Sequence, residues 1–212
     1  MKDINAMTKV FIIESPSFID IIENRKEGDA LSKILDLAEI ENELFSVSDI
    51  ETFRIAFKLI AQNVKNIKEN LAAIHIHFSM HGTKEGLFLS DKTFLNWKMF
   101  YEILKNFNDE INYVILPSGM KVAPTYLAFS VCDGFAAKTI KDFGEESPYT
   151  SLIGPIKTVE WSDSLLAFSI YYHNTILKKL GTKKALINMN EIIGNNIFQA
   201  DPGKEIILTD IK

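Results

Sequence analysis

The hydrophobic positions of the chain follow two alternating patterns. Short runs of mainly apolar residues predict buried strands, and longer segments with apolar side chains three or four positions apart predict amphipathic helices. The predicted strands cover residues 9–15, 43–47, 72–80, 124–132 and 151–161, the last of them kinked. The predicted helices cover residues 28–40, 49–64, 96–108, 134–143 and 163–180. Residues 86–91 read as a short extended piece, and the segment after residue 180 has no clear assignment.

This alternation predicts an α/β fold with a mostly parallel sheet. Strands that are apolar along their whole length must be covered on both faces, and the intervening helices provide that cover. No repeat, low-complexity segment or linker-like boundary interrupts the pattern, so we expect a single domain over residues 1–212. Active sites of such sheets form beyond the carboxyl ends of the strands. That edge is expected to bring together the loops at 14–15, 81–82 and 132–133.

Composition excludes several classes of function. The 212 residues are 47% hydrophobic and 24% charged, which supports a sizeable core. The net charge of −5 argues against a nucleic-acid or anionic-membrane surface, since either needs a basic patch. No stretch approaches the roughly 18 apolar residues that span a bilayer, and the start, "MKDINAMTKVFII", lacks the apolar core of a secretory signal. With one cysteine and neither of these features, the expected location is the cytoplasm.

Three histidines stand in the segment "HIHFSMHGTKEG" (75–86). His75 and His77 are two positions apart on a predicted strand, so they share one face and could form a metal-binding pair. A metallohydrolase would need further ligands on later strands, but the remaining histidine, His173, lies in a predicted helix. We therefore expect His75 and His77 to be buried or to support a nearby site, and we expect no metal and no other cofactor.

His81 and Cys132 are candidates for a catalytic pair. Each follows a predicted strand on the same edge, and they are 132 − 81 = 51 positions apart. A thiol is mostly protonated near neutral pH, and an imidazole within reach makes the thiolate accessible. Each residue has a glycine close behind it, Gly82 and Gly134, and such glycines let backbone N–H groups point at a developing oxyanion.

Three segments resemble the CHAT family of caspase-like peptidases. They are "HIHFSMHGTKEGLFLSD" (75–91), "YLAFSVCDGFAAK" (126–138) and "SLIGPIKTVEWSDSLLAFSIYYHNTI" (151–176), in the order that the family has them. The spacing of the histidine and the cysteine is also similar to that in caspases, whose histidine lies about 50 residues upstream of the nucleophile. The resemblance covers most of residues 70–178.

The resemblance implies a caspase-like three-layer sandwich, in which a mainly parallel six-stranded sheet has helices on both faces. It also implies a Cys-His dyad that requires no acid, with Cys132 as the nucleophile and His81 as the general base and acid. The N–H groups of Gly82 and Cys132 would form the oxyanion hole. The chain departs from the caspase pattern before the cysteine, where Ser130-Val131 replaces Gln-Ala. Cleavage after aspartate is therefore not implied.

The charges expected near the dyad favour a basic substrate. Caspases hold an aspartate with arginines, but the arginines here, Arg25 and Arg54, fall in predicted helices or their approach. Carboxylates in a pocket favour lysine or arginine before the scissile bond by charge pairing. The acids in the corresponding loops are Glu14, Asp133, Glu160 and Asp163. The alternative is that Glu14 and Asp163 are exposed loop acids, with Asp163 capping the helix that follows.

These observations predict a cysteine endopeptidase that acts on proteins. Because no sensor or pro-segment is recognisable, we expect a regulatory protein partner, and the resemblance suggests a bacterial defence or programmed-death system. The main alternative is a catalytically silent binding or assembly module of the same fold. A flavodoxin-like or receiver-like domain would need a phosphate-binding glycine loop or an acid cluster early in the chain, and "IIESPSF" (12–18) has one acid and no glycine.

Overall fold

The computed structural model of the chain describes residues 7–67 and 71–204. The strands are β1 (Met7–Ser15), β2 (Asn42–Ser46), β3 (Leu71–Thr83), β4 (Gly86–Phe88), β5 (Phe94–Asn96), β6 (Val114–Ile115), β7 (Lys121–Val122), β8 (Thr125–Ser130), β9 (Ser151–Pro155) and β10 (Phe198–Pro202). The α-helices are α1 (Phe18–Ile22), α2 (Glu27–Leu37), α3 (Ile50–Ile67), α4 (Trp97–Ile111), α5 (Trp161–Tyr172) and α6 (Thr182–Ile192). A 3₁₀ segment, η2 (Gly134–Asp142), follows β8, and a π-helical turn, η3 (His173–Leu177), extends α5.

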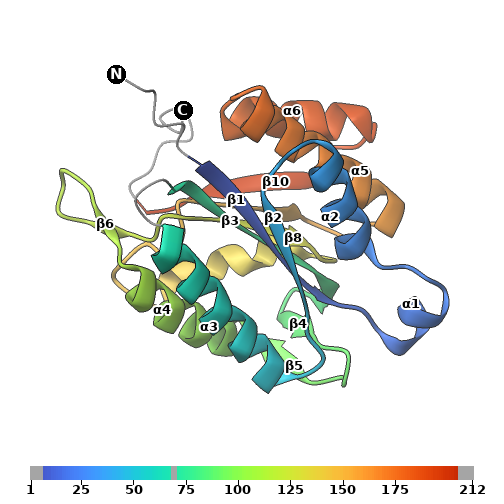
Figure 1. Cartoon of the computed structure of the whole chain (residues 1–212), viewed down its shortest axis with the longest axis horizontal. Helices are drawn as coiled ribbons and strands as arrows, with labels where there is room; N and C mark the ends of the chain where they lie inside the picture. The colour runs from blue at the N-terminus through green and yellow to red at the C-terminus, as the bar shows by residue number, and fades with distance from the viewer. Residues whose placement is uncertain (1–6, 68–70, 205–212) are drawn as a thin grey trace.

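The central sheet has the order β10-β9-β8-β3-β1-β2 (Figure 1). The pairs from β2 to β9 are parallel, and β10 adds an antiparallel edge to β9. The far end of β3 continues into an antiparallel extension with β4 and β5. This arrangement confirms the mainly parallel six-stranded sheet that the sequence predicts.

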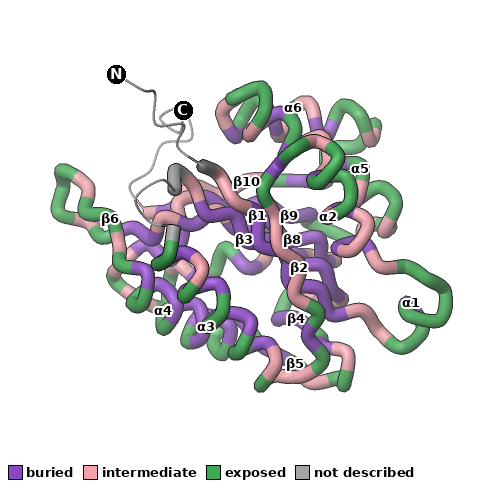
Figure 2. Tube along the Cα trace, viewed as in Figure 1, coloured by how far each residue is buried: buried purple, intermediate pink, exposed green. Residues whose placement is uncertain are grey.

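The helices form one layer on each face of the sheet. Alternate residues of β3 point to opposite faces, so Ile76 and Phe78 pack toward α3 and α4, whereas His77 packs toward α5. The second core, between the sheet and α2, α5 and α6, contains Phe168 and Tyr172. Purple, buried segments run through the sheet between the two helical layers in Figure 2. The three-layer sandwich is thereby confirmed.

The predicted helix starts have identifiable chemical causes. Asp49 precedes α3, and its carboxylate accepts the backbone N–H groups of Glu51 and Thr52 at 3.0 and 2.8 Å. Asn96 precedes α4 and accepts the N–H of Met99 at 2.9 Å. Each side chain supplies a partner for backbone groups that the first helical turn leaves unpaired.

Two parts of the chain differ from the predicted elements. The predicted strand at 151–161 is wrong in its second half, because β9 ends at Pro155 and Trp161 opens α5. The unassigned segment after residue 180 forms α6 and the antiparallel strand β10. None of the helices in the described part of the chain is long and apolar enough to cross a membrane.

Candidate active site

His81 lies near the end of β3, and Cys132 lies two residues beyond the end of the neighbouring strand β8. The predicted loop at 81–82 is wrong, because both residues belong to β3 and pair with β4. Ser79 of β3 and Ser130 of β8 are direct partners in the parallel register. Their face of the sheet carries α5, since Ser130 Oγ lies 2.6 Å from Ser164 Oγ of that helix, and His81 shares it by strand alternation. The register thus brings the ends of β3 and β8 side by side, with one candidate near each end.

Cys132 stands at the tip of a sharp turn from β8 into η2. Asp133 has a φ of 56°, in the left-handed region, and the N–H of Gly134 donates to the carbonyl of Val131 at 2.9 Å. Asp tolerates this conformation better than most residues. Gly134 packs against β8 so closely that a Cβ atom there would lie 2.7 Å from the Cβ of Phe129. The half-buried cysteine is thereby held at the sheet edge.

The loop between β9 and α5 contacts both candidates. The Sγ of Cys132 donates to the carbonyl of Val159 over 3.9 Å, and the N–H of Asp133 donates to the carbonyl of Lys157 at 3.3 Å. The Trp161 ring meets the His81 ring edge-on at 5.4 Å between centroids. Trp161 is half-buried, so its ring is only partly accessible beside the imidazole.

His81 contacts the side chain of an acid that the sequence did not single out. Its Nε2 lies 2.6 Å from Oδ2 of Asp20, which belongs to the short helix α1. Among the described residues, the hydrogen bonds of the imidazole and the thiol go to Asp20 and Val159 respectively, and not to one another. The two candidates are therefore bonded to different partners in this structure.

Asp20 is held by several groups at once. Its side chain is 1% exposed, although it belongs to a surface helix. Ser17 donates its N–H to Oδ2 at 3.0 Å, and the Arg25 guanidinium contacts Oδ1 at 3.1 Å. Burial acts to raise the pKa of Asp20, but hydrogen bonds from Ser17 and His81 outweigh it and lower the pKa to about 2. Asp20 is therefore a carboxylate at neutral pH.

Glu14, which was predicted to line the substrate pocket, is buried and hydrogen-bonded to the start of α2. Its side chain is buried, and Oε1 accepts the N–H groups of Gly28 and Asp29 at the start of α2, at 2.7 and 3.3 Å. Burial raises the pKa of Glu14, and the N–H donors oppose the rise. This arrangement caps α2. We therefore leave Glu14 out of the proposed substrate pocket, because a ligand would have to displace the start of α2 to reach it.

The other three acids lie in the turn after Cys132 and at the start of α5. Asp133 follows Cys132 and is half-buried, whereas Glu160 and Asp163 are exposed. Glu160 is the N-cap residue of α5 without a side-chain cap bond, and Asp163 lies in the first helical turn. The alternative that Asp163 caps this helix is therefore wrong. Exposed Lys157 in the same loop offsets part of their charge.

His75 and His77 are buried, as predicted. His75 stacks on Tyr126 with 4.8 Å between centroids, and burial lowers its pKa to about 4. His77 lies between Tyr172 and Glu27, with its Nδ1 at 3.2 Å from the hydroxyl and its Nε2 at 3.3 Å from Oε2. No group of three or more His, Cys, Asp or Glu side chains suited to a metal ion occurs within residues 7–67 and 71–204.

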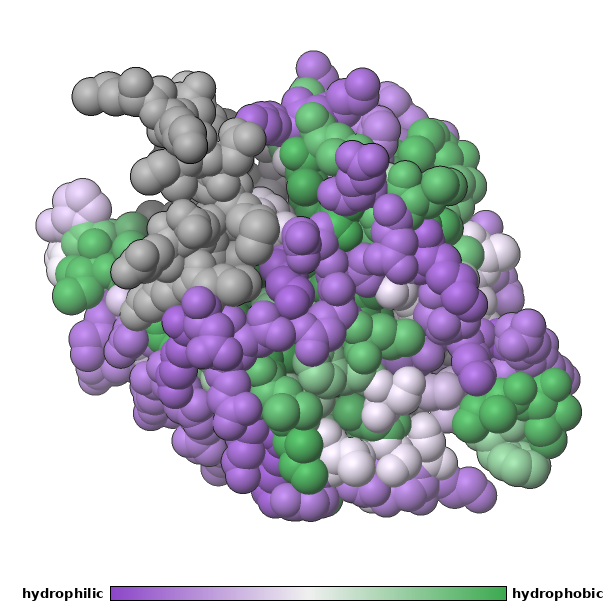
Figure 3. Space-filling view, viewed as in Figure 1, coloured by the Kyte–Doolittle hydropathy of each residue, from purple (hydrophilic) through white to green (hydrophobic). Residues whose placement is uncertain are grey.

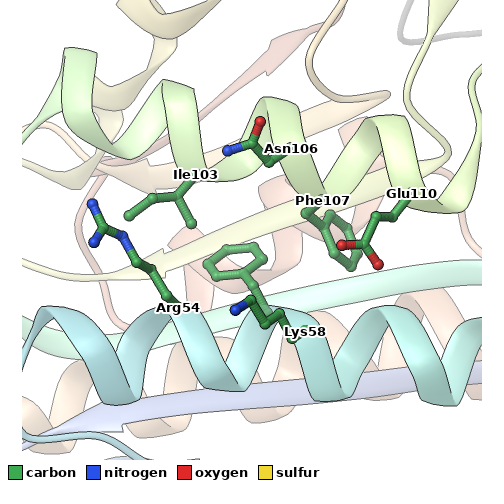
Figure 4. Close-up of a pocket in the computed structure, with 7 residues that line it drawn as sticks. Arg54, Lys58, Ile103, Asn106, Phe107 and Glu110 are labelled. Atoms are coloured by element: carbon green, nitrogen blue, oxygen red, sulfur yellow. The ribbon is translucent and has the colours of Figure 1, made fainter.

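A surface pocket between α3 and α4 is separate from this site. Figure 4 shows Arg54 and Lys58 of α3 facing Glu110 and Asn106 of α4 across it. These helices cover the face of the sheet opposite to His81 and Cys132. The pocket therefore has no direct part in chemistry at the dyad.

Comparison with known proteins supports the fold. No family model and no curated protein matches the chain. A solved structure of a secreted C11 cysteine protease from Bacteroides thetaiotaomicron, in complex with an irreversible peptide inhibitor, matches with a TM-score of 0.55 and 7% sequence identity. The match covers 88% of this chain and 58% of the protease, so the chain spans little more than half the length of that structure. The chain has a caspase-like α/β fold; membership of the CHAT family stays a prediction.

Proposed function

We propose that the chain is a cysteine endopeptidase in which Cys132 is the nucleophile and His81 the general base and acid. The observation that supports the proposal is that both residues contact the Val159–Trp161 segment at the paired ends of β3 and β8. The fold shared with a C11 cysteine protease is consistent with this chemistry. Fold alone does not specify function, so the proposal depends on the site.

The reaction would proceed in two halves. His81 takes the thiol proton of Cys132, and the thiolate attacks the carbonyl carbon of the scissile peptide bond. The N–H groups of Gly82 and Cys132 stabilise the oxyanion, and the imidazolium then gives its proton to the leaving amine. Water, deprotonated by the same imidazole, attacks the thioester, which releases the acid and regenerates the thiol. The Sγ of Cys132 would first have to leave the carbonyl of Val159, and catalytic hydrogen bonds commonly tighten only when substrate binds.

The proposed substrate is a protein cleaved after lysine or arginine. Asp133, Glu160 and Asp163 supply negative charge next to Cys132 or to the Val159–Trp161 segment that contacts the dyad. Carboxylates there would pair with a basic side chain before the scissile bond. Lys157 lowers this charge, so the preference is expected to be moderate.

Control by a protein partner, in a bacterial defence or programmed-death system, belongs to the same proposal. It is supported by the resemblance of residues 75–91, 126–138 and 151–176 to the CHAT family. It predicts that the chain alone cleaves slowly or selectively. Promiscuous cleavage of unfolded protein substrates by the purified chain at full rate would contradict a requirement for a partner.

Covalent labelling tests the peptidase proposal. An arginyl chloromethyl ketone peptide should modify Cys132 stoichiometrically and faster than its aspartyl counterpart, as measured by intact-mass spectrometry. His81→Ala should abolish the labelling, while Cys132→Ala serves as the control for other nucleophiles. A thiol that reacts with the small reagent iodoacetamide but with neither peptide reagent would instead support the catalytically silent module, which the Val159 contact of the sulfur also favours.

A further inference from the structure

We propose that Asp20 is a positioning residue that fixes the orientation and tautomer of His81. The inference rests on the proposed function for its catalytic consequence, but its structural part can be tested independently. Asp20 Oδ2 lies 2.6 Å from Nε2 of His81, across 81 − 20 = 61 positions of sequence. The contact joins the loop after β1 to the end of β3, which are neighbouring strands of the sheet.

The contact determines which nitrogen of the ring can act as a base. An ionised carboxylate only accepts hydrogen bonds, so the neutral imidazole must carry its proton on Nε2 to donate to Asp20. Nδ1 is then left with the lone pair that can take the thiol proton of Cys132. Once His81 is protonated, the nearby negative charge stabilises the imidazolium until the leaving amine receives its proton.

The surroundings of Asp20 stabilise its ionised form and fix the orientation of its side chain. Oδ1 is bound by the Arg25 guanidinium, whereas Oδ2 is shared by Ser17 and His81. The second contact of Arg25 goes to Glu23, with Nη1 and Oε2 separated by 2.6 Å. A buried carboxylate with this many donors has little freedom to rotate. His81, by contrast, has a side chain that is 44% exposed and would be mobile without such a partner.

The composition of α1 supports the same role. Asp20 is the buried residue of this five-residue helix, and the other members are exposed and apolar. These exposed residues are Phe18, Ile19, Ile21 and Ile22, at 72, 58, 47 and 67%. They form the green patch at the lower right of Figure 3, where α1 projects in Figure 1. Burial of apolar surface therefore does not explain how α1 is fixed to the body, whereas the hydrogen bonds of Asp20 do.

Asp20 also takes part in capping α1, so a structural role has to be separated from a catalytic one. Ser17 is the N-cap residue, and its side chain and backbone are both bonded to Asp20 in a capping box. Ile21→Gly weakens α1 through a loss of helix propensity but leaves Ser17, Asp20 and the contact with His81 in place. It is the structural control for Asp20→Asn, which keeps an acceptor oxygen but removes the charge.

The tautomer is measured first, because this readout needs no peptidase activity. Long-range ¹H–¹⁵N spectra of the full chain, taken at a pH where His81 is neutral, should show the Nε2–H form in the wild type and in Ile21→Gly. An Nδ1–H form in the wild type would overturn the proposal. If the tautomer is as expected but Cys132 reacts with no peptidyl reagent, the peptidase proposal fails while the positioning of His81 stands.

The kinetic consequence is measured with an arginyl peptide substrate. Asp20→Asn should lower kcat by about 10²-fold, with KM changed less than about twofold, because the lost charge acts on proton transfer and not on binding. Ile21→Gly should keep kcat within about threefold of the wild type. An unchanged kcat in Asp20→Asn, or an equal loss in Ile21→Gly, would show that Asp20 serves only the structure of α1.

Discussion

Gly82 and Val131 lie against each other where the end of β3 meets the turn that carries Cys132. A Cβ atom built on Gly82 would be 2.3 Å from Cγ1 of Val131 and 3.0 Å from the carbonyl oxygen of Gly86. The first distance is much shorter than a van der Waals contact, so any side chain at position 82 would clash with the turn that carries Cys132. The glycine after the histidine therefore fixes how closely the two halves of the site approach.

Gly82→Ala is expected to lower the free energy of unfolding by about 1–3 kcal/mol and to reduce labelling of Cys132 strongly. The added methyl group must displace Val131, which precedes the nucleophile. Val131→Ala in the same chain should restore part of both losses, since it removes the clashing Cγ1. Chemical denaturation and labelling rates of the two single variants and the double variant give the coupling; additive effects would contradict a direct contact.

Asp20→Asn is expected to lower the free energy of unfolding by about 1–2 kcal/mol at pH 7. The folded state holds the pKa of Asp20 at about 2, below its ordinary 3.8, so the stabilisation is full above pH 3.8 and is lost as the pH falls toward 2. The difference between wild type and variant should shrink over that same window. Denaturation curves at pH 7, 4 and 2.5 measure it, and a pH-independent difference would argue against the charge as its cause.

Glu14→Gln is expected to leave stability at pH 7 unchanged or slightly higher. Glutamine keeps an oxygen for the N–H groups of Gly28 and Asp29 and removes a buried charge. Burial raises the pKa of Glu14, so the folded state favours its protonated form. The contribution of Glu14 to the free energy of unfolding is full below about pH 4.5 and is lost as the pH rises through the raised pKa. The relative gain of the variant should therefore disappear on acidification. Glu14→Ala, which lacks the acceptor, should lose about 1–3 kcal/mol at every pH.

His75→Phe is expected to stabilise the protein most at mildly acidic pH. Burial lowers the pKa of His75 to about 4, and its Nδ1 is buried without a partner among the described residues. The folded state favours the neutral form of His75. The free energy of unfolding is therefore unaffected by this group above its unfolded pKa of about 6.5 and decreases as the pH falls toward 4. Phenylalanine keeps the stacking on Tyr126, so the variant should gain about 1–2 kcal/mol at pH 5 relative to pH 8. His173→Phe, at an exposed position, is the control.

The pair Glu160→Lys and Asp163→Lys is expected to shift cleavage preference away from basic residues. Reversal of two charges near the thiol should lower kcat/KM for arginyl substrates by about tenfold, equivalent to about 1.4 kcal/mol, and leave substrates with a neutral residue there almost unchanged. Glu51→Lys together with Glu102→Lys, on α3 and α4 of the opposite helical layer, is the charge-matched control. An equal loss for basic and neutral substrates would place these acids outside the pocket.

The fold was predictable from sequence because buried strands and amphipathic helices leave different hydrophobic patterns. Strand β8, for example, is apolar through "YLAFS" and ends at the predicted edge. Helix α1 left no such pattern, because its apolar residues face solvent and its five residues are too few for a helical stripe. Strand β9 was predicted too long, since Val159 and Trp161 continue its apolar run although the chain has already turned toward α5.

The site was predictable only in part. Cys132 and His81 could be singled out because each follows a predicted strand and combines a reactive side chain with a nearby glycine. Asp20 could not, since an acid in a loop is ordinary and its partner is distant in sequence. The same limit applies to Glu14, whose use as a cap for α2 depends on how two elements meet in space.

The pairing of Ser79 with Ser130 also indicates where relatives of this protein can tolerate insertions. The 51-residue interval between the histidine and the cysteine does not have to be kept, because α4 and the β6–β7 hairpin can change in length without moving the strand ends. Because Cys132 lies beyond β8, its place depends on the turn at Asp133 and on the close packing of Gly134 against Phe129. Insertions within the intervening connection are therefore expected to be tolerated, whereas a residue inserted between Ser130 and Gly134 would move the thiol away from the carbonyl of Val159.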